Sequence, residues 1–107
     1  MVERIDWTDL AKKQLKDIHD YYLDVASERI AKNLTNKIIE RVDILIENPY
    51  AGRKEDLLSD YTEGYRYLVI ENYKIIYWIN NNIAVIASVF DCRQNPKKMS
   101  EHLKITL

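Results

Sequence analysis

Residues 64–93 read GYRYLVIENYKIIYWINNNIAVIASVFDCR, and this stretch decides the fold. It holds three runs of β-branched and aromatic residues, which the turn signals Glu71-Asn72 and Asn80–Asn82 separate. Because short turns bring consecutive strands together in opposite directions, we predict an antiparallel β-meander over about residues 64–92.

The preceding residues 8–47 have the pattern of two amphipathic helices. The first begins at Thr8-Asp9, where a capping side chain precedes a carboxylate, and the second begins in the same way at Ser27-Glu28. Apolar residues recur at helical spacing in both, at Ala11, Leu15, Ile18, Tyr22 and Val25 and then at Ala31, Leu34, Ile38, Val42 and Leu45. The short Ala26-Ser27 link predicts an antiparallel helical hairpin, which Asn48-Pro49 ends.

We therefore expect one α+β domain over residues 1–107. A short N-terminal strand at residues 3–7 precedes the hairpin, a loop follows it at about residues 48–63, and a basic C-terminal tail extends over residues 93–107. The antiparallel two-helix hairpin is expected to pack on one face of a mainly antiparallel β-sheet.

The composition, with 47% hydrophobic and 31% charged residues, is typical of a soluble globular protein. A net charge of −1 excludes a protein that binds nucleic acid through overall positive charge. The charges are unevenly distributed, since residues 66–107 carry 6 Lys or Arg and 3 Asp or Glu, whereas residues 1–65 carry 10 and 14. An anionic or acidic partner would therefore meet the half that contains the sheet.

The N-terminus lacks the pattern of a signal peptide, and no apolar run is long enough to cross a membrane. We therefore expect a cytoplasmic protein that does not act at a membrane. For Cys92, the only cysteine, we expect a buried thiol at a strand end rather than a disulfide or a metal ligand. The sequence has no nucleotide-binding or metal-ligand motif, so we expect neither a cofactor nor a metal.

Three cations of the meander, Arg66, Lys74 and Arg93, form the first candidate site, because each can stabilise phosphate charge. Whether they converge depends on the turn at residues 70–72. A two-residue loop pairs Ile70 with Tyr73 and places Arg66 and Lys74 on opposite faces of the sheet, whereas a three-residue loop places them on the same face. The sequence leaves both alternatives open.

The tail carries a denser basic group, Arg93, Lys97 and Lys98, which is either solvated surface or a binding surface for nucleic acid or an acidic partner. RNA cleavage would also need a proton-transfer group near the cations. His102 lies close to them in the sequence, whereas His19 belongs to the charged face of the first helix, where we expect an ordinary surface residue.

Tyrosines alternate in the predicted strands, at Tyr65, Tyr67, Tyr73 and Tyr77. Aromatic rings on a sheet can stack on unpaired bases. Packing across strand pairs explains them better, so we expect core residues.

Several short motifs, in their order and spacing, resemble the RelE/ParE superfamily of type II toxin–antitoxin toxins, also described as plasmid stabilisation proteins. They start with Ile5-Asp-Trp7 and Tyr21-Tyr22 and continue with the loop Asn48-Pro49-Tyr-Ala-Gly52-Arg53. The strands supply Gly64-Tyr-Arg66, Tyr73-Lys-Ile-Ile-Tyr77 and Phe90-Asp-Cys-Arg93-Gln-Asn-Pro96. The resemblance covers nearly the whole chain and implies a toxin that a cognate antitoxin neutralises.

Two activities are known in this superfamily, and the resemblance is closer to the ParE-like branch, which inhibits DNA gyrase without catalytic residues. In the alternative, a RelE-like endoribonuclease cleaves mRNA on the ribosome, and Arg66, Lys74, Arg93 and His102 would be its catalytic residues. Met99 stands near the position where many RelE-like members carry a C-terminal Tyr, which disfavours that alternative. As target-binding residues the resemblance suggests Arg66, Arg93, Lys97 and Lys98. An inactive scaffold is a third reading, and a homodimer is left open.

Overall fold

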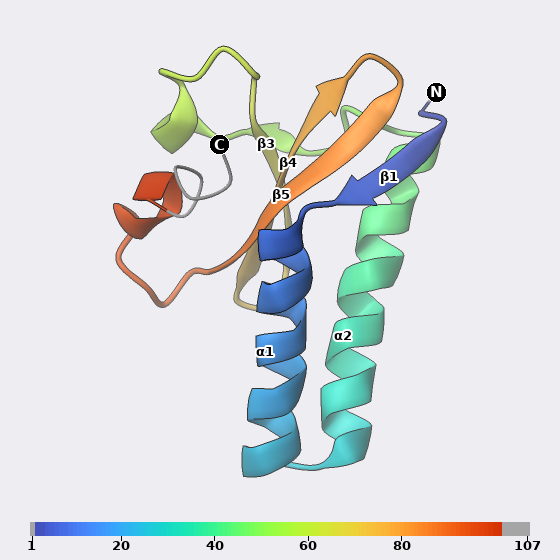
Figure 1. The fold of residues 1–107 in the computed structure, drawn as a ribbon, viewed down its shortest axis with the longest axis vertical. Coiled ribbons are helices and arrows are strands. Elements are labelled where there is room, and N and C mark those ends of the chain that lie inside the picture. Colours follow the sequence, from blue (N-terminus) through green and yellow to red (C-terminus); the bar gives the residue numbers. More distant parts are fainter. Residues whose placement is uncertain (1, 102–107) are drawn as a thin grey trace.

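The computed structural model describes residues 2–101, which form a helical hairpin and a five-stranded sheet (Figure 1). The strand β1 (Arg4–Trp7) precedes the helices α1 (Asp9–Val25) and α2 (Glu28–Asp43). The other strands are β2 (Arg53–Lys54), β3 (Arg66–Ile70), β4 (Tyr73–Asn80) and β5 (Ile83–Asp91). The predicted α+β class, N-terminal strand, hairpin and meander are confirmed.

Both helices begin at the residues that the sequence indicates. The Thr8 hydroxyl oxygen accepts a hydrogen bond from the Ala11 amide at 3.2 Å, and the Ser27 hydroxyl oxygen accepts one from the Ile30 amide at 3.1 Å. The α2 helix is shorter than expected, because it ends at Asp43 and the chain continues as a 3-10 turn over Ile44–Ile46. The hairpin thus turns where predicted.

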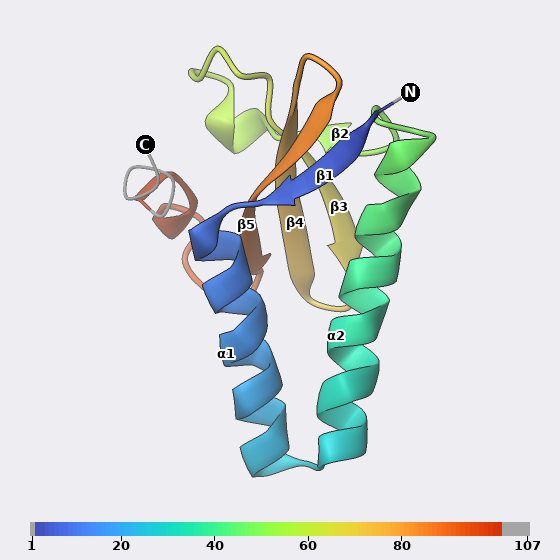
Figure 2. The same cartoon turned by 45° about the vertical axis from the view of Figure 1, so that its right-hand side comes forward.

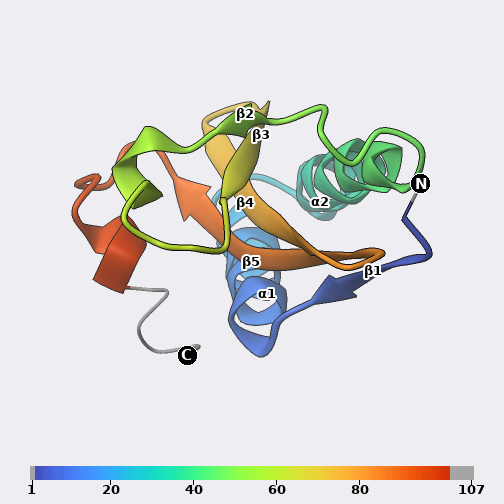
Figure 3. The same cartoon turned by 90° about the horizontal axis from the view of Figure 1, so that it is seen from above.

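The strands lie in the order β1-β5-β4-β3-β2, so β1 and β2 form opposite edges of the sheet (Figure 3). The pairing is parallel between β1 and β5 and antiparallel elsewhere, as in a mainly antiparallel sheet. The two-residue strand β2 lies inside the region that we expected to be a loop, because it forms only by pairing with the distant β3.

Side chains cover both faces of the sheet. The hairpin packs on one face, as predicted, and the buried cluster there includes Ile38, Val42, Leu45, Leu68, Ile75, Tyr77 and Ile86. The opposite face carries a second cluster made by Leu58, Tyr65, Ile76, Ala87, Phe90 and Met99. In this second cluster the segment after β2 and the C-terminal tail pack against β4 and β5, an arrangement that was not predicted from the sequence.

The hairpin extends well past the sheet, so its far end, including the turn between α1 and α2, projects from the body of the molecule (Figures 1 and 2). Apolar side chains near this end are exposed, namely Tyr21, Leu23, Val25 and Ile30. A protein surface of this kind is a candidate for contact with another protein.

Candidate functional site

The turn between β3 and β4 decides how the candidate cations are arranged. Ile70 pairs with Tyr73 across a two-residue turn, in which Glu71 adopts a positive φ of 52°. Arg66 is therefore opposite Tyr77 on the face that the hairpin covers, whereas Lys74 is opposite Val69 on the other face. The three-residue alternative is wrong, and these two cations do not converge.

Arg66 and Tyr77 hold the loop between α2 and β2 against the sheet by hydrogen bonds to its backbone. The Arg66 guanidinium donates a hydrogen bond to the Gly52 carbonyl at 2.8 Å and lies over the Tyr50 ring, 4.9 Å from its centroid. The buried Tyr77 hydroxyl accepts a hydrogen bond from the Gly52 amide and donates one to the Pro49 carbonyl, both at 2.9 Å. Burial raises the pKa of Tyr77, so the hydroxyl stays protonated and able to donate.

Gly52 makes this loop anchor possible because the backbone comes very close to the sheet there. A Cβ atom on residue 52 would lie 2.6 Å from the Tyr67 carbonyl oxygen and 2.7 Å from the Tyr77 ring and hydroxyl. The motif residues Pro49, Gly52, Arg66 and Tyr77 thus form one connected structure.

Lys74 is bound to a carboxylate that the sequence gave no reason to expect nearby. Its ammonium group lies 2.7 Å from the Glu55 carboxylate, whose side chain is only 3% exposed, and 4.2 Å from the centre of the Tyr67 ring. The other Glu55 oxygen accepts a hydrogen bond from the Leu57 amide at 3.2 Å. Lys74 therefore neutralises a buried negative charge and holds the segment after β2 against the sheet.

Arg93 forms a two-point ion pair with Asp91 at the end of β5. Its Nε and Nη2 atoms lie 3.0 and 2.7 Å from the two carboxylate oxygens, and Asn72 donates a further hydrogen bond to Asp91 at 3.1 Å. The guanidinium lowers the pKa of the Asp91 carboxyl, and this carboxylate raises the pKa of Arg93. Arg93 remains exposed, so it can still meet a partner.

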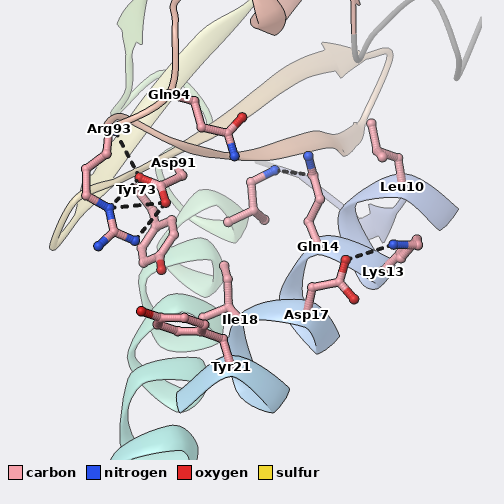
Figure 4. Close-up of a pocket in the computed structure, with 11 residues that line it drawn as sticks. Leu10, Lys13, Gln14, Asp17, Ile18, Tyr21, Tyr73, Asp91, Arg93 and Gln94 are labelled. Carbon is pink, nitrogen blue, oxygen red and sulfur yellow. Dashed lines mark hydrogen bonds and ion pairs between the residues drawn. The ribbon is translucent and has the colours of Figure 1, made fainter. Parts of the chain in front are cut away.

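A cleft of about 520 Å³ separates this ion pair from α1 (Figure 4). Tyr73 and Arg93 line it on the sheet side, and Tyr21 and the pair Lys13–Asp17, 2.8 Å apart, line it on the helix side. Burial is the main reason why the pKa of Tyr73 is raised, so its hydroxyl is neutral in this cleft. The cleft is polar at its walls and holds charges of both signs.

The beginning of the C-terminal tail has a fixed position. Met99 is 1% exposed within the second buried cluster, and the Asn95 side chain accepts a hydrogen bond from the Lys97 amide at 3.0 Å. Lys97 and Lys98 are exposed and have no ion-pair partner among residues 2–101. His102 lies outside the described residues.

The minor sequence predictions had mixed outcomes. Tyr65, Tyr73 and Tyr77 are buried, which confirms their assignment to the core, whereas Tyr67 is only partly buried against the second cluster. His19 is partly exposed beside Asp20. The prediction of a buried Cys92 was wrong: β5 ends at Asp91, and the thiol is exposed where the chain leaves the sheet. Residues 2–101 contain no group of three or more His, Cys, Asp or Glu arranged to hold a metal ion.

One family model matches most of the chain. The family model described as the ParE toxin of the type II toxin–antitoxin system parDE matches residues 5–96. The chain belongs to the ParE toxin family. The predicted RelE/ParE superfamily and its ParE-like branch are thus confirmed, since the matching family model describes toxins of type II toxin–antitoxin systems.

A solved structure described as the chromosomal ParDE TA system from P. aeruginosa has the same fold as this ParE family chain. The TM-score is 0.68 over 82% of this chain and 94% of that chain, at 23% sequence identity. A tRNA dimethylallyltransferase of Fusobacterium nucleatum is 29% identical over 92 residues, or 85% of this chain. The chain spans only 30% of the length of that curated relative. In the described part of this ParE family chain, neither helix is long and apolar enough to span a membrane.

The two carboxylates that pair with the candidate cations were not predicted from the sequence. Glu55 is 19 residues from Lys74 and sits in an acidic stretch that reads as surface, so no local signal connects them. Asp91 is two residues from Arg93 on the same chain segment, and that spacing could have suggested the pair. In both cases the cation that looked available has a partner within the fold.

Proposed function

We propose that this ParE family chain inhibits DNA gyrase and that a cognate antitoxin neutralises it. The observation that carries the proposal is the separation of the cations. Arg66 and Lys74 point to opposite faces of the sheet, and each is bound to a group of the chain itself. A nuclease needs its cations around one phosphate, and this arrangement does not supply such a set.

The alternative function, ribosome-dependent mRNA cleavage, finds less support. Lys74 would have to leave the buried Glu55 carboxylate to reach RNA, which costs several kcal/mol. Met99, near the position where many RelE-like proteins carry a tyrosine, is buried and cannot transfer protons. His102 would have a catalytic role only in this alternative.

Target binding is proposed for the exposed cations of the tail region, Arg93, Lys97 and Lys98. They lie on the segment after β5, which ends at Asp91, and cations at a surface steer an anionic partner such as a gyrase–DNA complex. Arg66 contributes indirectly, because it holds the loop at Gly52 in place. This assignment predicts that the tail region is needed for toxicity.

The antitoxin partner is proposed to cover apolar surface of the hairpin. Four apolar side chains near the turn between the helices are exposed, and a partner helix could bury them. Both gyrase and such an antitoxin are intracellular proteins, so the proposed site of action is the cytoplasm.

The test is a pair of assays on the purified chain. One measures supercoiling of relaxed plasmid by gyrase and the amount of cleaved DNA trapped on the enzyme, and the other measures mRNA cleavage on programmed ribosomes. We expect inhibition of supercoiling and intact mRNA. Cuts in the ribosomal A site with normal supercoiling would establish the alternative, and activity in neither assay would indicate an inactive scaffold.

A further inference from the structure

The two helices of the hairpin run side by side (Figure 2), and a cavity of about 490 Å³ lies between them. Its apolar walls come from Trp7 of β1, Leu15 of α1 and Ile39 of α2. Trp7 and Leu15 also pack against the buried cluster between the hairpin and the sheet, whereas Ile39 is 40% exposed. The cavity has the size of a small-molecule site, for which about 300–1,000 Å³ is typical.

One stripe of α1 forms the long side of this interhelical groove. The stripe consists of Lys12, Leu15, Lys16 and His19. Residues three and four positions apart are neighbours on a helix surface, so these side chains lie along one face of α1. Ile39 lines the groove from α2. From Lys12 to His19 the helix rises about 10 Å, so the groove is elongated along the hairpin.

The charged groups that line the interhelical groove are cations. Lys12 and Lys16 belong to its lining, whereas no Asp or Glu of residues 2–101 does. Lys16 lies 2.7 Å from Asp20, which is outside the lining. Lys12 is exposed and has no ion-pair partner in the described part of the chain. The ammonium group of Lys12 is therefore available to an anion that enters the groove.

We infer that the interhelical groove binds a free amphipathic anion, namely a single acyl chain that ends in a carboxylate. The chain lies between Leu15 and Ile39, where each methylene that leaves water adds to the affinity. The carboxylate accepts charge-assisted hydrogen bonds from the ammonium group of Lys12. A partner helix is about 10–12 Å across with its side chains and is too wide for a cavity of this volume and length. A second copy of this chain would bring the same cations together.

The probe is octanoate, kept below the concentration at which it forms micelles. Octanol and octyltrimethylammonium carry the same chain without the charge or with the opposite charge. Each is titrated into isotope-labelled protein and followed by NMR, and Trp7 emission is read in Trp78→Phe, which leaves Trp7 as the only tryptophan. We expect octanoate to shift amides of residues 12–19 and 35–39 and to bind more tightly than either analogue. Hexanoate should bind about tenfold more weakly, because two methylenes are missing.

Variants separate the charged and the apolar components of binding. Lys12→Glu should lower the affinity for octanoate by about fivefold. Lys54→Glu is the matched control, because Lys54 is also exposed, lies on β2 outside the groove, and should leave the affinity unchanged. Ile39→Glu removes an apolar wall and should lower the affinity by about tenfold, whereas Ile39→Leu should keep it within about twofold. The Lys12 variant keeps the test valid if Ile39→Glu does not fold.

Four results would overturn the inference. Octanoate could leave the amides of the groove unshifted, or it could bind no more tightly than octanol or octyltrimethylammonium. The chain could attach to anionic phospholipid vesicles without binding monomeric octanoate, or it could form a dimer that Ile39→Glu dissociates. None of these measurements uses gyrase, so their outcome is independent of the proposed function.

Discussion

Replacing Lys74 by methionine tests whether this cation is part of the fold or part of an active site. In Lys74→Met the Glu55 carboxylate loses its partner at 2.7 Å while its side chain stays 3% exposed. Breaking a buried ion pair on one side typically costs 3–5 kcal/mol. Because the Lys74 side chain is 23% exposed, water reaches part of the pair, and we expect the lower end of that range, about 3 kcal/mol.

The stability of each variant is measured by urea unfolding and by thermal unfolding, both followed by circular dichroism and tryptophan fluorescence. A loss of about 3 kcal/mol lowers the melting temperature of a domain of this size by more than about 10 °C. The double variant Lys74→Met with Glu55→Gln removes the unpaired charge and should recover most of the lost stability. Lys98→Met is the control for an exposed lysine and should change stability by less than about 0.5 kcal/mol.

The reasoning is refuted if Lys74→Met unfolds within about 0.5 kcal/mol of the wild type. It is also refuted if the double variant is as unstable as Lys74→Met, since the cost would then not come from the stranded carboxylate. Unchanged stability together with lost toxicity would return Lys74 to the list of catalytic candidates.

Three further predictions concern the loop anchor and the ion pair at the end of β5. Tyr77→Phe removes the hydroxyl that bonds both the Gly52 amide and the Pro49 carbonyl. We expect the free energy of unfolding in urea to fall by about 1–3 kcal/mol, and an unchanged midpoint would contradict this prediction. Arg93→Ala should weaken growth arrest while the protein stays folded, and full arrest by the folded variant would remove Arg93 from the target-binding residues. The lowered pKa of Asp91 means that its carboxylate stabilises the folded state above about pH 4 and loses this contribution as the pH falls further. When the pH falls from about 4 to about 2, Asp91→Asn should therefore lose less free energy of unfolding than the wild type does. Parallel profiles of unfolding free energy against pH would contradict the stabilising role of the Asp91 carboxylate.

The sequence predicts the local elements well because their signals are local. Thr8 and Ser27 mark the helix starts, and the turn residues around Glu71 separate two strands at the right place. Periodicity identifies the core face of each helix for the same reason. The fold class and the hairpin could be read from these signals.

Long-range features could not be predicted in this way. The pairing of β1 with β5 joins residues about 80 positions apart, and β2 is a strand only because β3 lies beside it. The second buried cluster depends on Met99 folding back over the sheet. Such contacts depend on the assembled fold rather than on neighbouring residues.

The candidate site shows the same limit. The residues Arg66 and Lys74 were identified, but their roles depend on a one-residue difference in turn length, which reverses the face of a strand. Glu55 gave no signal because an acidic residue in a loop usually stays in water. Motif positions in this family chain therefore identify structural anchors as readily as functional groups.

The central claim is that this chain acts on gyrase without a catalytic set of cations. Its most direct test uses the double variant Lys74→Met with Glu55→Gln in the supercoiling assay. The measurement is the concentration of protein that halves supercoiling by purified gyrase, for wild type and variant side by side. We predict that both inhibit gyrase at concentrations within about threefold of each other. A folded double variant that leaves supercoiling intact, beside an inhibitory wild type, would contradict the account, as would a wild type that leaves gyrase fully active.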